Sequence, residues 1–131
     1  MERLVVWSPR VLSLLRIITA LLFMEHGLMK LFHFPAAQPG VPSPLPPLLV
    51  AAGALEIFGG AHILLGLFTR PFAFILSGMM AVAYFMAHAS QGFWPALNGG
   101  EPAILYCFIF LYLAFQGGGE WSIDAQIRKR P

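Results

Sequence analysis

The chain has 131 residues, of which 58% are hydrophobic and only 11% are charged, with a formal net charge of +2. Soluble domains carry about 25% charged residues, so this composition excludes a conventional water-exposed surface and predicts an integral membrane protein with a single domain over residues 1–131. The small net charge excludes a nucleic-acid-binding surface, and the lone Cys107 excludes an intrachain disulfide and any CxxC metal or redox motif.

Four apolar segments follow one another along the chain, at roughly 11–32, 48–68, 71–90 and 102–116. A helix needs about 20 residues to cross the roughly 30 Å of hydrocarbon in a bilayer. The first three segments reach that length and the fourth is short. The sequence therefore predicts an all-α membrane protein with four transmembrane helices.

The connections between these segments indicate how the helices are arranged. Residues 33–47 contain six prolines and no charged residue, which excludes a helix and predicts a loop. Thr69-Arg70-Pro71 is a tight turn, so we expect the second and third helices to be antiparallel neighbours. Residues 121–130 are expected to form a short amphipathic tail helix at the membrane surface, with a basic end.

Positive charge predicts the topology. With four spans, seven of the eight basic residues lie on one side of the membrane, and only Lys30 lies on the other. Cytoplasmic loops are enriched in Lys and Arg. We therefore predict a multi-pass antiparallel bundle in the inner (cytoplasmic) membrane, with the N-terminus and the C-terminus both in the cytoplasm.

Polar side chains gather in the outer half of this predicted bundle. At about 1.5 Å per residue, His26 lies roughly 9 Å and Lys30 roughly 3 Å below the outer end of the first helix. Glu56 lies about 12 Å below the outer end of the second helix, whereas His88 ends the third and Glu101 begins the fourth. A charged group at such a depth costs several kcal/mol unless it is paired or faces a cavity, so these residues mark a candidate site.

Helical periodicity predicts an inward face for each helix. The expected faces are Arg16, Ala20, Phe23, His26, Gly27 and Lys30; Gly53, Glu56, Gly60, Leu64 and Leu67; Ser77, Met80, Ala81, Tyr84 and His88; and Glu101, Leu105, Phe108 and Tyr112. Glu25 and His62 fall off these faces and receive no role.

Glu56 is the strongest candidate, because a carboxylate in the middle of an apolar helix is costly. We predict catalytic roles for Glu56 and His88. The predicted ligand-binding residues are His26, Lys30, Tyr84, Trp94, Asn98 and Glu101. Structural alternatives stay open: Glu56 as half of an ion pair that only locks the helices, Lys30 extending to the membrane surface, and Trp94 as an interface anchor. No Glu-x-x-His pair is present, so no metal centre is expected.

Several motifs together resemble the DoxX family of small four-helix membrane proteins, over roughly residues 11–125. They are Arg16…His26-Gly27…Lys30, Leu55-Glu56-Ile57-x-Gly59-Gly60, Leu65-Gly66-Leu67-x-Thr69-Arg70-Pro71, Met80-Ala81-Val82-Ala83-Tyr84-Phe85…His88, Gly92-Phe93-Trp94-Pro95…Asn98-Gly99-Gly100-Glu101 and Trp121-Ser122-x-Asp124. The resemblance implies an inner-membrane protein linked to quinone or sulfur redox chemistry. The proline content of residues 33–47 and the position of His62 depart from the family pattern.

Two hypotheses follow. In the first, the chain is a quinone-binding or other small-molecule-binding subunit of a quinone-linked oxidoreductase. No redox centre is visible in the sequence, so electrons would come from a partner protein. In the second, the chain is a non-catalytic scaffold or assembly protein, and the same residues fix helix register. A small transporter, acting only as a homo-oligomer, is a third and weaker alternative.

Overall fold

The computed structural model describes residues 1–129, and the last two residues of the predicted tail, 130 and 131, lie outside this range. Helices account for all the regular structure within it. They are α1 (Glu2–Val5), α2 (Ser8–Phe32), α3 (Pro47–Leu65), α4 (Thr69–Ala87), the 3₁₀ turn η1 (Ala89–Gln91), α5 (Pro95–Asn98), α6 (Glu101–Gln116) and α7 (Ile123–Arg128).

The long helices agree with the four apolar segments, with shifted ends. Helix α3 ends at Leu65, three residues earlier than predicted, because Gly66 takes the left-handed conformation (φ 66°) that commonly terminates helices. Helices α2 and α3 and the α4–η1 segment are long and apolar enough to cross a membrane, whereas α6 is shorter, as predicted. Large apolar side chains such as Phe58, Phe74 and Phe108 are exposed along these helices, which is typical of a surface that faces lipid.

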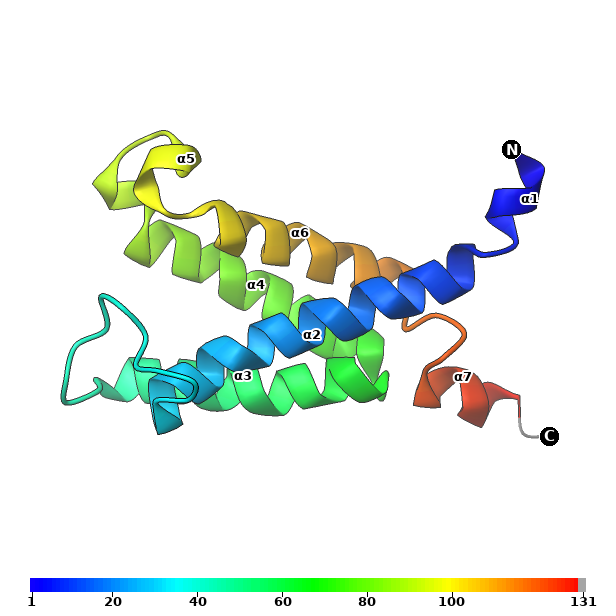
Figure 1. The fold of residues 1–131 in the computed structure, drawn as a ribbon, viewed down its shortest axis with the longest axis horizontal. Coiled ribbons are helices and arrows are strands. Elements are labelled where there is room, and N and C mark those ends of the chain that lie inside the picture. The colour runs from blue at the N-terminus through cyan, green and yellow to red at the C-terminus, as the bar shows by residue number, and fades with distance from the viewer. Residues whose placement is uncertain (130–131) are drawn as a thin grey trace.

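The helices pack as two pairs, α2 with α3 and α4 with α6, and contacts between the pairs are far fewer. In Figure 1 the pairs converge where the α3–α4 turn lies and diverge towards the connections 33–46 and 88–100. We call these the turn end and the loop end. Buried apolar side chains from all four helices form the core between them: Ala20, Phe23, Ile63, Ala73, Leu76, Met80, Phe110 and Leu113.

Arg16 is fully buried at the turn end, with 0% of its surface exposed. Its guanidinium donates from Nη1 to Ile63 O at 2.6 Å and to Leu64 O, two carbonyls in the last turn of α3. Nε donates to Gly118 O at 2.8 Å and Nη2 to Trp121 O at 2.7 Å, both in the segment after α6. The last carbonyls of a helix lack partners within it, so Arg16 supplies donors that α3 needs and attaches the chain after α6 to α2.

Two further side chains cap helix ends at the turn end. Asp124 accepts hydrogen bonds from the N–H groups of Phe68 and Thr69, each at 2.9 Å, at the start of α4. Arg70 donates to the carbonyls of Ala114 (3.3 Å) and Phe115 near the end of α6. The turn end is therefore held together by side chains from α2, α4 and α7.

Replacing Arg16 by Lys should lower the free energy of unfolding by about 2 kcal/mol or more, because one ammonium cannot reach all four carbonyls and buried acceptors that lose a donor cost about 1–3 kcal/mol each. Arg10→Lys is the matched control, since Arg10 makes a partly exposed ion pair with Glu120 at 3.2 Å and should change stability by no more than about 0.5 kcal/mol. Denaturant titration in detergent micelles, followed by circular dichroism, measures both. Equal stability of the two variants would contradict the role given to Arg16.

A second prediction concerns acid. Partial burial acts to raise the pKa of Asp124, but the N–H groups of Thr69 and Phe68 lower it more, so the pKa of this carboxyl lies below its ordinary value. A depressed folded-state pKa means that the ionised carboxylate stabilises the fold above the unfolded pKa of about 3.9, and that this contribution disappears as the pH falls through the folded-state value. Asp124→Asn should therefore be less stable than the parent at neutral pH, and the gap between the two should close at acidic pH. A gap that stays constant from pH 7 to pH 3 would rule this out.

Candidate functional site

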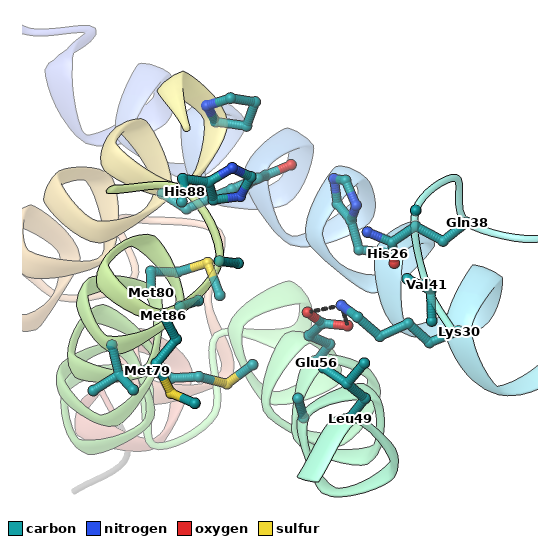
Figure 2. Close-up of a pocket in the computed structure, with 18 of the residues that line it drawn as sticks. His26, Lys30, Gln38, Val41, Leu49, Glu56, Met79, Met80, Met86 and His88 are labelled. Carbon is teal, nitrogen blue, oxygen red and sulfur yellow. Dashed lines mark hydrogen bonds and ion pairs between the residues drawn. The ribbon is translucent and has the colours of Figure 1, made fainter. Parts of the chain in front are cut away.

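A cavity of about 670 Å³ lies between the two helix pairs near the loop end (Figure 2). Its walls come from α2, α3, α4, η1, α6 and the loop 33–46, and most of them are apolar, including three methionines of α4. Binding sites for small organic molecules are typically of about this size, about 300–1,000 Å³, and combine apolar walls with a few polar groups. The polar side chains that line the cavity are His26, Lys30, Gln38, Glu56, His88, Gln91 and Tyr106.

An ion pair forms the most polar part of the wall. Lys30 Nζ lies 2.6 Å from Glu56 Oε1 and 2.8 Å from Oε2, and the two side chains are only 10% and 4% exposed. Figure 2 shows the pair at the cavity surface, with His26 on the same side. Pairing offsets part of the cost of keeping two charges away from water.

Glycines bring α2 and α3 close enough for this pair to form. A Cβ atom on Gly27 would lie 2.7 Å from the carbonyl oxygen of Gly53 and 2.8 Å from Cγ1 of Ile57. Lys30 and Glu56 each lie three residues beyond one of these glycines, on the same helix face. Close contact of small residues is a common way for membrane helices to pair.

His88 lies across the cavity from the ion pair (Figure 2), and the connection that follows it holds its ring in place. Its Nδ1 lies 3.0 Å from the carbonyl oxygen of Asn98. A carbonyl can only accept, so Nδ1 carries a proton and donates it; whenever the ring is neutral, Nε2 is an acceptor. Asn98, 3% exposed, in turn donates to Tyr84 Oη (3.2 Å) and Gly92 O (2.9 Å) and accepts from the N–H of Gly100 (2.8 Å).

The predicted site residues thus divide into three groups. Glu56, His88, His26 and Lys30 all line the cavity. Tyr84 and Asn98 form hydrogen bonds that order the connection holding His88, but they do not line the cavity. Trp94 is 65% exposed, and Glu101 borders a separate, shallow recess with Pro95, Ile104 and Leu105.

The predicted inward face of the fourth helix is wrong. Leu105, Phe108 and Tyr112 are 61%, 63% and 50% exposed, whereas Ala103, Phe110 and Leu113 are buried. The predicted face runs through Glu101, which lies in the first turn of α6 and outside the core. Tyr106 was missed for this reason: it lies on the true inward face and its ring packs edge-on against His26 at 6.0 Å between centroids.

Gln38 was missed for a different reason. It lies in the proline-rich loop, where helical periodicity has no meaning, and it carries no charge. The loop folds back so that Gln38, Pro39, Gly40 and Val41 line the cavity. Within residues 1–129, no three His, Cys, Asp or Glu side chains lie close enough to hold a metal ion together.

Comparison with known proteins identifies the family of this chain. The model of the DoxX family matches residues 11–89. The chain belongs to the DoxX family. A Haemophilus influenzae protein described as uncharacterized is 43% identical over 99% of this chain and 100% of its own length. An uncharacterized membrane protein of Mycobacterium tuberculosis is 25% identical over 94% of this chain and 85% of its length. The Escherichia coli inner membrane protein YqjF is 30% identical over 88% of this chain and 90% of its length.

No solved structure matches this DoxX chain significantly. The family match confirms the predicted resemblance and a membrane protein with several apolar helices, over a shorter stretch than the motifs suggested.

Gly27→Ala should separate α2 from α3 and lower the free energy of unfolding by about 1–3 kcal/mol, because the new methyl group meets backbone of the neighbouring helix. Gly78→Ala is the control: a Cβ there meets nothing within 4 Å, and the helix gains up to about 1 kcal/mol in propensity. Thermal unfolding in detergent compares them. The interpretation fails if Gly27→Ala is as stable as Gly78→Ala.

Proposed function

We propose that this DoxX-family protein crosses the inner membrane four times, with both termini in the cytoplasm and the cavity in the outer half. The argument rests on charge: Arg3, Arg10, Arg70 and Arg128 belong to segments at the turn end, whereas Lys30 lies near the loop end. Basic residues accumulate on the cytoplasmic side of membrane proteins. The relative named as an inner membrane protein supports the same compartment.

Within that topology, the cavity binds a quinone or a similar small, largely apolar molecule, as a subunit of a membrane redox system. The observation that carries this proposal is the Lys30–Glu56 pair on the wall of a mostly apolar cavity. Charged side chains inside a membrane cost free energy, and for this reason they usually have a functional role. An apolar body would contact the methionines and aliphatic side chains of the walls, and its oxygens would meet the polar groups.

The position of the ion pair argues against a purely structural role. Lys30 and Glu56 join α2 to α3, which already pack closely through Gly27 and Gly53. The tie between the two helix pairs lies at the other end, where Arg16 holds α3 and the chain after α6. A scaffold that needed only fixed helices would therefore gain little from this pair.

The chemistry available is hydrogen bonding and proton exchange at the two sides of the ligand. Lys30 donates to a ligand oxygen on one side, and His88 Nε2 accepts from a ligand hydroxyl on the other. Glu56 balances the charge of Lys30 and can take up a proton. Electrons come from a partner protein in this proposal.

Mass spectrometry of the organic extract from protein purified in mild detergent tests the proposal. The parent protein should retain a quinone near one per chain, well above an unrelated membrane protein of similar size. Glu56→Gln removes the negative partner of Lys30 with little change in shape and should lower that ratio severalfold. Glu25→Gln makes the same chemical change on an exposed residue of α2 that does not line the cavity, and should retain the parent ratio.

The alternatives give different results. An extract no richer in quinone than the unrelated control contradicts the proposal and favours the scaffold hypothesis. Glu56→Gln protein that reaches lower membrane levels and loses its partners points the same way. Equal loss of quinone in the Glu25 and Glu56 variants would mean that the cavity is not where the quinone binds.

A further inference from the structure

The cavity opens sideways between α3 and α4. Leu48 of α3 and Val82 and Met86 of α4 line the cavity, yet 61%, 57% and 61% of their surfaces are exposed. Side chains that line a cavity and are also this exposed lie at the edge of an opening and not in a closed wall. We call the gap between these three residues the side opening. Figure 2 shows Met86 of α4 and Leu49 of α3 on opposite sides of the cavity.

The gap on the other side of the cavity, between α2 and α6, is bridged by aromatic rings. Phe23 of α2 and Tyr106 of α6 both line the cavity, and their ring centroids lie 5.3 Å apart. Helices α3 and α4 instead meet nearer the turn end, where the ring of Phe72 packs against Phe58 at 5.8 Å and against His62 at 4.0 Å between centroids. The cavity is therefore more open on the α3–α4 side.

The side opening runs along the membrane-crossing length of α4. Gly78, which also lines the cavity, lies nine residues before Ala87, the last residue of α4, or about 13.5 Å along the helix. The residues at the edges of the side opening are all apolar, so this opening suits the hydrocarbon of a bilayer. The cavity also reaches exposed residues at the loop end, and these include the polar Gln91. An apolar chain is therefore better placed in the side opening than at the loop end.

Gly78 has no packing reason to be a glycine. A Cβ atom on Gly59 would lie 2.9 Å from Cδ2 of Leu76, whereas a Cβ atom on Gly78 would meet nothing within 4 Å. A glycine inside a helix is less favourable than alanine, so this position gives up helix stability without gaining a closer helix contact. Gly78, Val82 and Met86 follow one another at intervals of four residues and share one face of α4. The missing side chain keeps the deep end of the side opening wide.

We propose that the ligand of the cavity carries a long apolar tail, and that this tail leaves the cavity between α3 and α4, past Gly78, into the hydrocarbon of the bilayer. This inference rests on the proposed function and adds the class of ligand to it: a membrane-resident quinone with a long chain, not a small water-soluble one. The polar ring then lies beside the Lys30–Glu56 pair, while the tail stays in a medium as apolar as itself. Such a ligand exchanges with the membrane without passing through water.

Photo-crosslinking of the full chain in lipid nanodiscs tests the path of the tail. The tail probe is a benzoquinone with a ten-carbon chain and a diazirine at the far end of that chain. Irradiation with and without an excess of the same quinone lacking the diazirine, followed by peptide mass spectrometry, gives the label that specific binding produces at each residue. This competed label should concentrate on α3 and α4 beside the side opening. Label on other lipid-facing residues should not respond to the competitor.

Two variants test Gly78. A ring probe serves as the reference, with a methyl group in place of the tail and the diazirine on the ring. Gly78→Phe places a phenyl group in the side opening and should lower competed labelling by the tail probe about tenfold, with a much smaller effect on the ring probe. Ala54→Phe adds the same group to an exposed position of α3 that does not line the cavity, and should leave both probes at the parent level.

Each outcome decides between the claims. Competed label from the tail probe in the loop 33–46, or on α2 and α6, overturns the inference while the proposed function stands. Equal loss of the two probes in Gly78→Phe places Gly78 at the ring and removes its role in the path of the tail. Absence of competed label from both probes on the parent protein overturns the proposed function itself. The map of the tail uses only the parent protein, so it holds even if Gly78→Phe folds poorly.

Discussion

A buried guanidinium that binds backbone carbonyls, and no carboxylate within residues 1–129, organises this molecule. Arg16 donates hydrogen bonds to backbone carbonyls at the end of α3 and in the segment after α6, where the helix and turn geometry leaves these acceptors unpaired. The partial negative charge of a helix C-terminus also favours a cation there. One side chain on α2 thereby joins the first helix pair to the segment that follows α6. Asp124 and Arg70 add ties between α7, α4 and α6 at the same end.

The ties at the turn end affect how the helices pack at the loop end. The helices pack tightly within each pair and have few contacts between pairs. The space between the pairs therefore widens towards the loop end, where long, adaptable side chains and the cavity occupy it. Several polar side chains, among them Lys30, Glu56 and His88, face that space. Lys30 and Glu56 balance each other's charge as a pair, and Nδ1 of His88 is bound to the carbonyl oxygen of Asn98. The cavity is therefore mostly apolar, with polar side chains on the walls of both helix pairs.

Much of this could be predicted from the sequence, and the failures have physical reasons. Glu56 and Lys30 are polar residues inside long apolar helices, so their phase and depth were readable, and the structure places both on the cavity wall. Helix α6 has no charged residue within its core-facing stretch, so the face predicted through Glu101 is wrong. Arg16 was recognised as basic but its partners are backbone carbonyls, which no sequence pattern reveals. Gln38 depends on how a proline-rich loop folds back.

The chain connections have a mechanical consequence. The loop 33–46 joins α2 to α3, and the connection 88–100 joins α4 to α6, so each stays within its own helix pair. The α3–α4 turn is the covalent link between the pairs, and it lies at the opposite end from the cavity. A small rotation of the two helix pairs about the turn end would therefore widen the space between them at the loop end. Neither connecting loop would have to change its length or its end points.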